Sequence, residues 1–451
     1  MPASARTIAE LARALRARET TAEASTTECL DRIAERNPAI NAFITVLADQ
    51  ALAQARQADA ELARGHDRGP LHGVPFSLKD IIDINGVATT AASKVRDGHV
   101  AADDAPVSAR LRKAGAVFLG KANLHEFAFG TTNEDSAFGP VRHPLDPGRS
   151  PGGSSGGSAA SILDGMAYAS IGTDTGGSIR IPSAVCGLVG LKPSLGEIPV
   201  DGVVPLSTTM DHVGPLCRSV EDAGIIFDVL RGGQAPVRQP RQVKGLRVGV
   251  LRGYFTSLLD PQVADAFERT CTSLTGSGAL LHDVDIPHAG DIAPIYLHIV
   301  LAEAAAYHAK TLESHSDEYT PNVRIRLEMG RYILAEDYVR ALRGRDVLIA
   351  EVDAALGGRD VLLLPSMGVP AIRLGAATVR IGAVEEPVRN VMLRLTQLFN
   401  VTGHPAITLP CAKTTDGLPI GAQLVGGRNG TDALLSAAAA VEALLSQNQG
   451  Y

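Results

Sequence analysis

A run of glycine and serine, GRSPGGSSGGSAAS at residues 148–161, decides how the rest of the chain is interpreted. Such a run can be a flexible linker, because Gly and Ser have no large side chains with which to build a core. The same composition also lets a packed backbone turn sharply and approach another group, with a hydroxyl beside it. The flanking segments favour this second interpretation. Both contain short apolar runs of the kind found in strands, and the segment SAASILDGMA that follows can begin a helix.

Apolar patterning around this run indicates an α/β fold. The first 65 or so residues contain helical runs such as TIAELARALRAR and TTECLDRIAER, with apolar residues three and four positions apart. Residues 73–215 contain short apolar runs such as AVFLG and YASIG next to glycines, which is typical of buried strands. From Leu246 onward, strands such as DVLLLPS alternate with helices such as DPQVADAFERTCTSL. The pattern predicts a large mixed β-sheet covered by helices on both faces.

The organisation of the chain is that of one compact unit. No segment is long and polar enough to separate two domains, so we expect a single domain over residues 1–451. Within it we distinguish a helical segment at 1–65, a central region at about 72–218 and a less recognisable region at about 246–451.

Composition and charge exclude several classes of protein. The net charge of −7 without a basic stripe argues against nucleic-acid binding. No signal-type start and no uninterrupted apolar run of about 20 residues is present, which argues against a membrane protein. The five cysteines are widely spaced and form no CxxC pair, as expected for reduced thiols. These features predict a soluble cytoplasmic protein.

Metal and cofactor motifs are missing from the sequence. It contains no HExxH, no close Cys/His cluster and no EF-hand loop, and the Gly-rich run lacks the GK[ST] of a phosphate loop. We therefore expect no metal and no cofactor.

The Gly/Ser run matches GxSxG twice, at Ser154 and at Ser155. This pattern is the nucleophile elbow of α/β-hydrolase esterases, in which a strand leads directly into the serine. Here three prolines interrupt the preceding HPLDPGRSP, which makes it a poor strand. Only His404, in VTGHPAI, has the setting of a partner histidine. The elbow is kept as an alternative.

A second serine motif follows in ASIGTDTGGSIRIPSAVCG, beginning at Ala169. Gly176 and Gly177 precede Ser178 and allow consecutive backbone N–H groups to converge on one point. N–H donors beside a nucleophile are what acyl transfer requires for its oxyanion. The alternative interpretation is an ordinary turn in which Asp174 caps the backbone.

Lys79 lies inside the apolar run VPFSLKDIID. Such a lysine can extend to the surface or pair with Asp80 or Asp83. If it is buried instead, desolvation lowers its pKa, and a neutral amine is a competent base for a serine.

Together these motifs resemble the amidase signature family, in its free-standing branch. GGSSGGSAA is followed by GTDTGGSIRIPSAVCG, with Ser154 and Ser178 24 positions apart and Lys79 75 positions before Ser154. The resemblance also includes GKANLHEFAFG, DHVGPL, NVTGHPAITLP and GLPIGAQLVG, so it covers nearly the whole chain.

The resemblance implies a role for each matching residue. Ser178 matches the acylated nucleophile, Lys79 the base, and Ser154 the bridging serine on a cis peptide, here the Gly153–Ser154 bond. Backbone N–H groups of Thr175, Gly176, Gly177 and Ser178 are implied as the oxyanion hole. Ser155 and Asp174 are expected to support the network. The implied pocket includes Ala128, Thr131 and Met210, with walls from the region at 246–451.

The implied activity is hydrolysis of amide-type C–N bonds through an acyl-enzyme. An amidotransferase subunit that supplies ammonia to a charged tRNA is the alternative, but such subunits place an aspartate where this chain has Leu393. Abundant Ala and Leu and the absence of Trp suggest an apolar cleft without a fixed charge. This favours small uncharged amides, aryl amides and carbamates (urethanes), with esterase activity also open. A homodimer is compatible with the sequence, which does not decide the oligomeric state.

Overall fold

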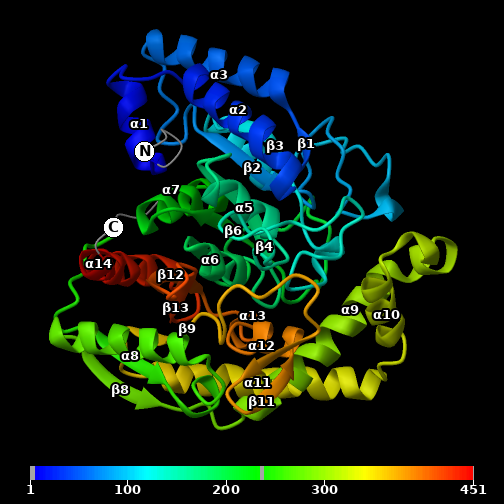
Figure 1. The fold of residues 1–451 in the computed structure, drawn as a ribbon, viewed down its shortest axis with the longest axis vertical. Coiled ribbons are helices and arrows are strands. Elements are labelled where there is room, and N and C mark those ends of the chain that lie inside the picture. The colour runs from blue at the N-terminus through cyan, green and yellow to red at the C-terminus, as the bar shows by residue number, and fades with distance from the viewer. Residues whose placement is uncertain (1–5, 234–237, 450–451) are drawn as a thin grey trace.

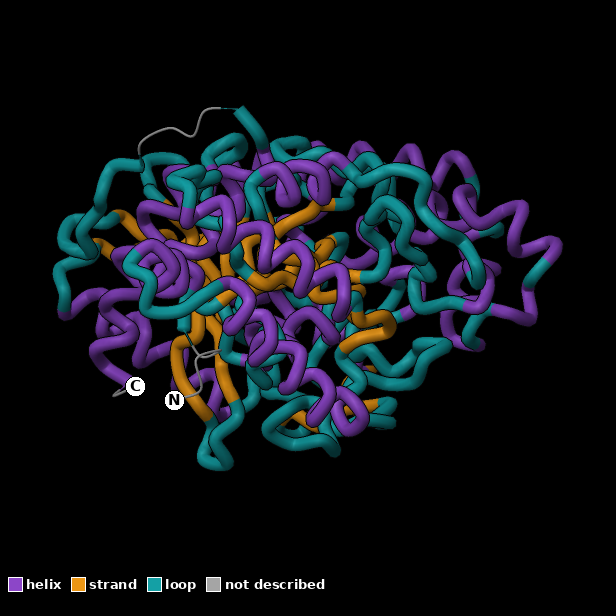
Figure 2. The backbone as a smooth tube through the Cα atoms, turned by 90° about the horizontal axis from the view of Figure 1, so that it is seen from above, coloured by secondary structure: helices purple, strands orange, loops and turns teal. Residues whose placement is uncertain are grey.

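The computed structural model describes residues 6–233 and 238–449, so the ends of the predicted 1–451 unit lie outside the described residues. Strands run through the middle of the molecule and helices surround them (Figure 1; Figure 2). The prediction of a mixed α/β fold built on one large sheet is confirmed.

The main sheet has eleven strands in the order β1-β3-β2-β4-β6-β5-β12-β13-β9-β7-β8. β2 is parallel to β3 and β4, and β7 is parallel to β8 and β9, whereas the remaining pairs are antiparallel. Its strands are β1 (Phe43–Val46), β2 (Pro75–Lys79), β3 (Val117–Ala122), β4 (Ala169–Asp174), β5 (Val189–Lys192), β6 (His212–Cys217), β7 (Arg247–Leu251), β8 (Leu280–Val284), β9 (Val361–Pro365), β12 (Ala406–Lys413) and β13 (Pro419–Val425). A separate hairpin pairs β10 (Thr378–Ile381) with β11 (Val384–Pro387).

The helical runs expected from the sequence coincide with the helices Ile8–Arg16, Ala22–Ile40, Gly156–Leu163 and Pro261–Gly276. Those of the first half are α1 (Ile8–Arg16), α2 (Ala22–Ile40), α3 (Ala48–Ala63), α4 (Pro106–Lys113), α5 (Gly156–Leu163), α6 (Arg180–Cys186) and α7 (Val220–Arg231). Those of the second half are α8 (Pro261–Gly276), α9 (Ile292–Ser314), α10 (Pro321–Gly330), α11 (Ala335–Leu356), α12 (Val388–Leu393), α13 (Leu398–Val401) and α14 (Thr431–Gln449).

The middle of the sheet is the most deeply buried part of the fold. Every residue of β2, β3, β4 and β6 is buried, as continuous apolar runs flanked by glycine predict. α5 packs on β4 and β2, and α6 packs on β5, β12 and β13. Side chains and loops at the ends of β2 and β4 therefore lie far from bulk water.

Among the described residues, the one helical stretch long and apolar enough to cross a membrane by length and composition is Ala289–Ser314, and α9 makes up most of it. It packs against α10, α11 and α13 and buries residues such as Ile292, Ile299 and Ala304 inside the protein. This contact with other helices explains its apolar composition.

Candidate active site

Lys79 is the last residue of β2 and is completely buried. Its Nζ donates hydrogen bonds to Ser154 Oγ at 2.7 Å and to Thr173 Oγ1 at 2.8 Å. It does not pair with Asp80, whose carboxylate instead lies 3.0 Å from Lys121 Nζ, so the ion-pair alternative is wrong. Burial lowers the pKa of Lys79 to about 7, although the charges of Asp174 and Asp211 oppose the change.

The Gly/Ser run is part of the buried interior and not a linker. The Gly153–Ser154 peptide bond is cis, and α5 begins at Gly156, within the run itself. Ser154 and Ser155 are both inaccessible to solvent. A Cβ on Gly153 would lie 2.9–3.1 Å from backbone atoms of the loop that holds Thr131, so the glycine allows a close approach of two loops.

The esterase elbow does not match this geometry. No strand leads into Ser154 in the described chain, and its hydroxyl contacts a lysine instead of a histidine. His404 lies elsewhere, with its ring nitrogens 2.9 Å from Thr402 Oγ1 and 3.1 Å from an Asp353 oxygen.

Ser178 lies in the short loop between β4 and α6 and is only 6% exposed. Its carbonyl accepts a hydrogen bond from the backbone N–H of Ser155 at 3.3 Å. Ser155 in turn donates from Oγ to the Thr173 carbonyl at 3.2 Å. The fold thus brings Ser178 next to the loop that presents Ser154 to Lys79.

The backbone N–H groups of residues 175–178 are free to serve a ligand. None of the four donates to an acceptor elsewhere in the described part of the chain. The carbonyl of Gly176 is fixed by Thr396, whose Oγ1 donates to it at 2.6 Å. Gly177 has a φ of +139°, where a side chain would be strained and would overlap Thr396. With the Gly176 carbonyl held by Thr396, the unpaired N–H groups of this loop can serve together as donors.

A buried polar network holds this loop in place. Asp174 pairs with Arg180 at 2.9 Å, and both side chains are inaccessible to solvent. Asn400 Nδ2 donates to the carbonyl and to the carboxylate of Asp174, each at 2.8 Å. Burial raises the pKa of the Asp174 carboxyl, but the Arg180 guanidinium outweighs it, so the pKa stays below its ordinary value. The network also explains how Asp174 caps the start of α6, accepting from the Ile179 and Arg180 N–H groups.

Asp211 supports the loop from the other side. One carboxylate oxygen accepts from Thr175 Oγ1 at 2.5 Å, and the other accepts from the N–H groups of Leu206 and Ser207 at 2.9 and 3.1 Å. Burial raises the pKa of Asp211 to about 6, against the effect of these hydrogen bonds. Asp211 therefore fixes Thr175 and acts electrostatically on Lys79.

The residues that sequence analysis did not identify are Thr173, Arg180, Thr396, Asn400 and Asp211. Thr173, Arg180, Thr396 and Asn400 are buried, and Asp211 is partly exposed in the wall of a cavity. Thr173 and Arg180 lie in the quoted GTDTGGSIRIP motif, Asp211 in DHVGPL and Asn400 in NVTGHP, so a local signal existed for these four.

The predicted pocket residues have different positions. Thr131 lines a cavity of about 510 Å³ together with Thr132, Arg326 and Arg389. Ala128 is buried with a φ of +57° and donates its N–H to the His125 carbonyl. Met210 is fully buried, and its carbonyl lies 2.7 Å from His212 Nδ1.

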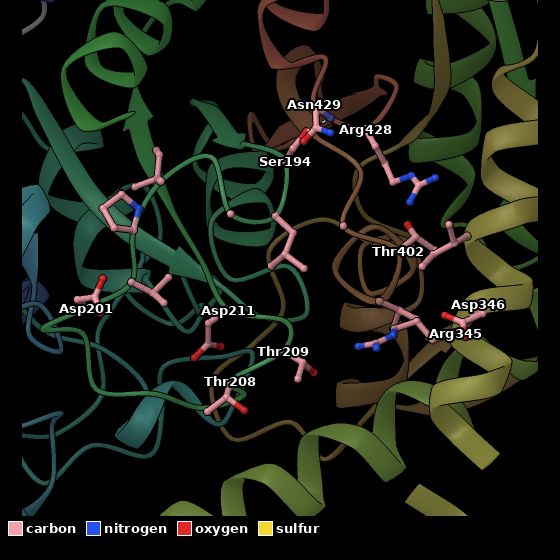
Figure 3. A pocket seen from close by; sticks show the side chains of 18 residues that line it. Ser194, Asp201, Thr208, Thr209, Asp211, Arg345, Asp346, Thr402, Arg428 and Asn429 are labelled. Carbon is pink, nitrogen blue, oxygen red and sulfur yellow. Dashed lines mark hydrogen bonds between the residues drawn. The ribbon is translucent and has the colours of Figure 1, made fainter. Parts of the chain in front are cut away.

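A larger cavity of about 710 Å³ lies between Asp211 and α11. Figure 3 shows Asp201 and Asp211 on one side of it and Arg345 and Asp346 on the other. None of Lys79, Ser154 and Ser178 lines this cavity. Its connection to the serine loops is through Asp211.

No group of three or more His, Cys, Asp or Glu side chains in residues 6–233 and 238–449 is placed to hold a metal ion. The five cysteines are free and buried.

Comparison with known proteins places this geometry in a family. The family model described as "Amidase" matches residues 24–435. The chain is 42% identical to an amidase from Pseudomonas putida, over 91% of this chain and 90% of that protein. It is 36% identical to a glutamyl-tRNA(Gln) amidotransferase subunit of Koribacter versatilis (strain Ellin345), over 96% and 97% of the two chains. A crystal structure of an amidase superposes with a TM-score of 0.92 at 37% identity, covering 97% of this chain and 99% of that one. The protein is therefore a member of the amidase family, the amidase signature hydrolases of amide C–N bonds.

Proposed function

We propose that this protein is a free-standing amidase that hydrolyses small amides through an acyl-enzyme on Ser178. The observation that carries the proposal is the buried hydrogen bond from Lys79 Nζ to Ser154 Oγ, in a loop whose next residue contacts Ser178. A lysine with a pKa of about 7 is partly neutral near physiological pH and can accept a proton.

In the proposed first half-reaction, Ser178 Oγ attacks the carbonyl carbon of the substrate. Ser154 takes the Ser178 proton and passes its own proton to neutral Lys79. Collapse of the tetrahedral intermediate breaks the C–N bond, and the proton returns through Ser154 to the departing amine. Water then attacks the acyl-enzyme by the same route, which releases the acid and restores all three side chains.

The oxyanion of each intermediate is assigned to the N–H groups of residues 175–178. Because these donors are fixed before reaction, they stabilise developing charge without reorganisation. Removing one such donor typically costs about 100- to 1,000-fold in kcat. Ser155 and Asp174 hold the loops that carry Ser154 and Ser178 in position and take no part in the proton transfer.

The acyl centre makes few demands on the substrate beyond a planar carbonyl. Uncharged amides, aryl amides and carbamates all meet this requirement, so urethane cleavage belongs to the proposal, with ester cleavage as a side activity. One sequence-based expectation does not fit the structure. The cavity beside Thr131 is lined by two arginines and is not a cleft without fixed charge.

The first test is amine release from a panel of 4-nitroanilides and matching aryl carbamates, for wild type beside Ser178→Ala. Mass spectrometry of quenched wild-type reactions should show an acyl adduct on the peptide that contains Ser178. Wild-type release that survives in Ser178→Ala would contradict the assignment of the nucleophile.

An amidotransferase subunit is the second candidate, because such subunits are similar to this chain over nearly its whole length. Against it, Leu393 occupies the place at which these subunits carry an aspartate. A Cβ on Gly176 would lie 3.0 Å from Leu393 Cδ2, so this leucine contacts the serine loop. A stable complex with partner subunits on purification, together with turnover only in that complex, would favour this candidate.

A further inference from the structure

The loop that carries Ser178 presents its N–H groups from planar peptide units. In a trans peptide, the C=O and the N–H of one unit share a plane and point in opposite directions. The peptide bonds between residues 174 and 178 are trans. A partner that holds the Asp174 carbonyl therefore sets the direction of the Thr175 N–H. In the same way, a partner of the Gly176 carbonyl sets the direction of the Gly177 N–H.

One short segment of the chain holds both of these carbonyls. Thr396 Oγ1 donates to the Gly176 carbonyl at 2.6 Å, and Asn400 Nδ2 donates to the Asp174 carbonyl at 2.8 Å. Thr396 lies in the turn after α12, and Asn400 lies in α13, four positions later. Both side chains are inaccessible to solvent, so water cannot replace either hydrogen bond.

The peptide unit between Gly176 and Gly177 depends most on its partner. It has a glycine on each side, and glycine lets the backbone rotate with few steric limits. The next unit is held by the start of α6, because the Gly177 carbonyl accepts from the Ile181 N–H at 2.7 Å. Thr396 Oγ1 lies only 2.2 Å from the Cβ position of Gly177. Loss of this hydroxyl would leave the Gly176 carbonyl buried without its donor, which favours rotation of the unit.

The turn that carries Thr396 is itself held firmly. Arg180 Nη1 donates to the Thr396 carbonyl at 2.9 Å, and Arg180 Nη2 donates to Asn400 Oδ1 at 2.6 Å. Gln423 of β13 accepts from Arg180 Nη1 at 2.7 Å and donates to the Leu395 carbonyl at 3.0 Å. The position of the Thr396 hydroxyl is therefore fixed by a central strand and by a buried guanidinium.

We propose that Thr396 is a positioning residue of the reaction, whose hydroxyl acts on the Gly176 carbonyl and thereby aims the Gly177 N–H at the oxyanion. Asn400 does the same for the Thr175 N–H through the Asp174 carbonyl. Neither side chain contacts the substrate or moves a proton. The inference rests on the proposed function, because it requires an oxyanion beside Ser178. It adds the two side chains that direct the donors of that oxyanion.

Thr396→Val tests this role, because valine keeps the shape of threonine and removes the hydroxyl. We expect kcat to fall about 10- to 100-fold with KM unchanged, since the oxyanion exists only in the transition state. Thr396→Ser keeps the donor and should recover most of the wild-type kcat. Full activity in Thr396→Val, or a change in KM alone, would contradict the positioning role.

Thr270→Val in α8 is the matched control. Thr270 is also buried, and its hydroxyl donates to the Ala266 carbonyl at 2.9 Å within the same helix. This variant should lose thermal stability as Thr396→Val does and keep the wild-type kcat. Equal losses of kcat in the two variants would mean that Thr396 serves stability alone.

A transition-state analogue separates the aiming of a donor from general damage to the site. An arylalkyl trifluoromethyl ketone forms a tetrahedral adduct with a serine, and the adduct oxygen takes the place of the oxyanion. Its Ki should rise in Thr396→Val by the factor by which kcat/KM falls, with Thr396→Ser close to wild type. An unchanged Ki beside a reduced kcat/KM would overturn the proposal.

Crystal structures of wild type and Thr396→Val give a readout that does not depend on turnover. We expect the peptide between Gly176 and Gly177 to be rotated in Thr396→Val and to keep its wild-type orientation in Thr270→Val. An unrotated peptide in Thr396→Val would show that the hydroxyl does not set its direction. If the peptide rotates but wild type hydrolyses no amide and resists the ketone, the proposed function is wrong and the hold of Thr396 on the loop stands.

Discussion

The Nζ atom of Lys79 donates a hydrogen bond to the hydroxyl of Ser154 at 2.7 Å, and both side chains are completely enclosed by protein. The lysine comes from the end of a central strand and the serine from a loop 75 positions later. A second hydroxyl, that of Thr173, also accepts from Nζ. Since no carboxylate pairs with the amine in the described structure, burial controls its protonation.

The first prediction concerns the pH dependence of turnover. Lys79 is protonated below its pKa of about 7 and cannot then accept the serine proton. We expect kcat/KM to fall about tenfold per pH unit below this value and to level off above it. The profile is measured with a substrate whose own groups do not titrate between pH 5 and 9. A rate that is flat across this range would contradict the role of Lys79.

Asp211→Asn should shift the acid limb of this pH profile, which is the fall in kcat/KM below the pKa of Lys79. The carboxylate of Asp211 favours the charged form of Lys79, so its removal lowers the pKa of Lys79 and shifts the limb to lower pH. Thr175 also loses a charged acceptor, and we expect kcat on the plateau to fall about tenfold through looser positioning. Asp201→Asn, an exposed acid on the wall of the larger cavity, is the control. An unchanged limb in Asp211→Asn would show that its charge does not reach Lys79.

The sequence was sufficient to predict the large mixed sheet and several of its strands and helices. Buried apolar runs and the 3.6-residue spacing are local patterns, so the expected strand DVLLLPS lies in β9 and the expected helix DPQVADAFERTCTSL lies in α8. For Lys79 the sequence left burial and exposure open, because a long lysine side chain in an apolar run can also reach the surface, and the structure shows it buried at the end of β2.

The charges that surround the serine loops could not be predicted in the same way. Arg180 meets Asn400 across 220 positions of sequence, and Arg389 meets Phe129 only through the packing of α12. Such contacts depend on tertiary packing, and no periodicity encodes them. Composition therefore suggested an uncharged cleft where the fold places two guanidinium groups.

Arg180→Met should destabilise the fold strongly. It leaves the carboxylate of Asp174 buried without its charged partner, which typically costs about 3 to 5 kcal/mol. The pKa of Asp174 is depressed in the folded state, so its contribution is present above about pH 4 and is lost as the pH falls. The gap between wild type and variant in urea unfolding should therefore be widest near neutral pH.

The control for Arg180→Met is Arg269→Met, which breaks an exposed pair with Asp265 on α8. Exposed pairs contribute about 0 to 1 kcal/mol. If both variants lose the same small free energy of unfolding, the buried pair does not stabilise the loop that carries Ser178.

The glycines of the Gly/Ser run at residues 148–161 allow close packing against neighbouring backbone. A Cβ on Gly157 would meet backbone atoms of Asn123 and Ala42, which have no rotamers with which to move aside. We expect Gly157→Ala to lower the free energy of unfolding by about 2 to 3 kcal/mol, through the strain of overpacking. Gly276→Ala at the end of α8 is the matched control, because its Cβ would have no atom within 4 Å. Alanine there should be neutral or stabilising by up to about 1 kcal/mol. Equal unfolding midpoints for the two variants would mean that the run can accommodate an added methyl group and that a glycine at position 157 is not required for close packing.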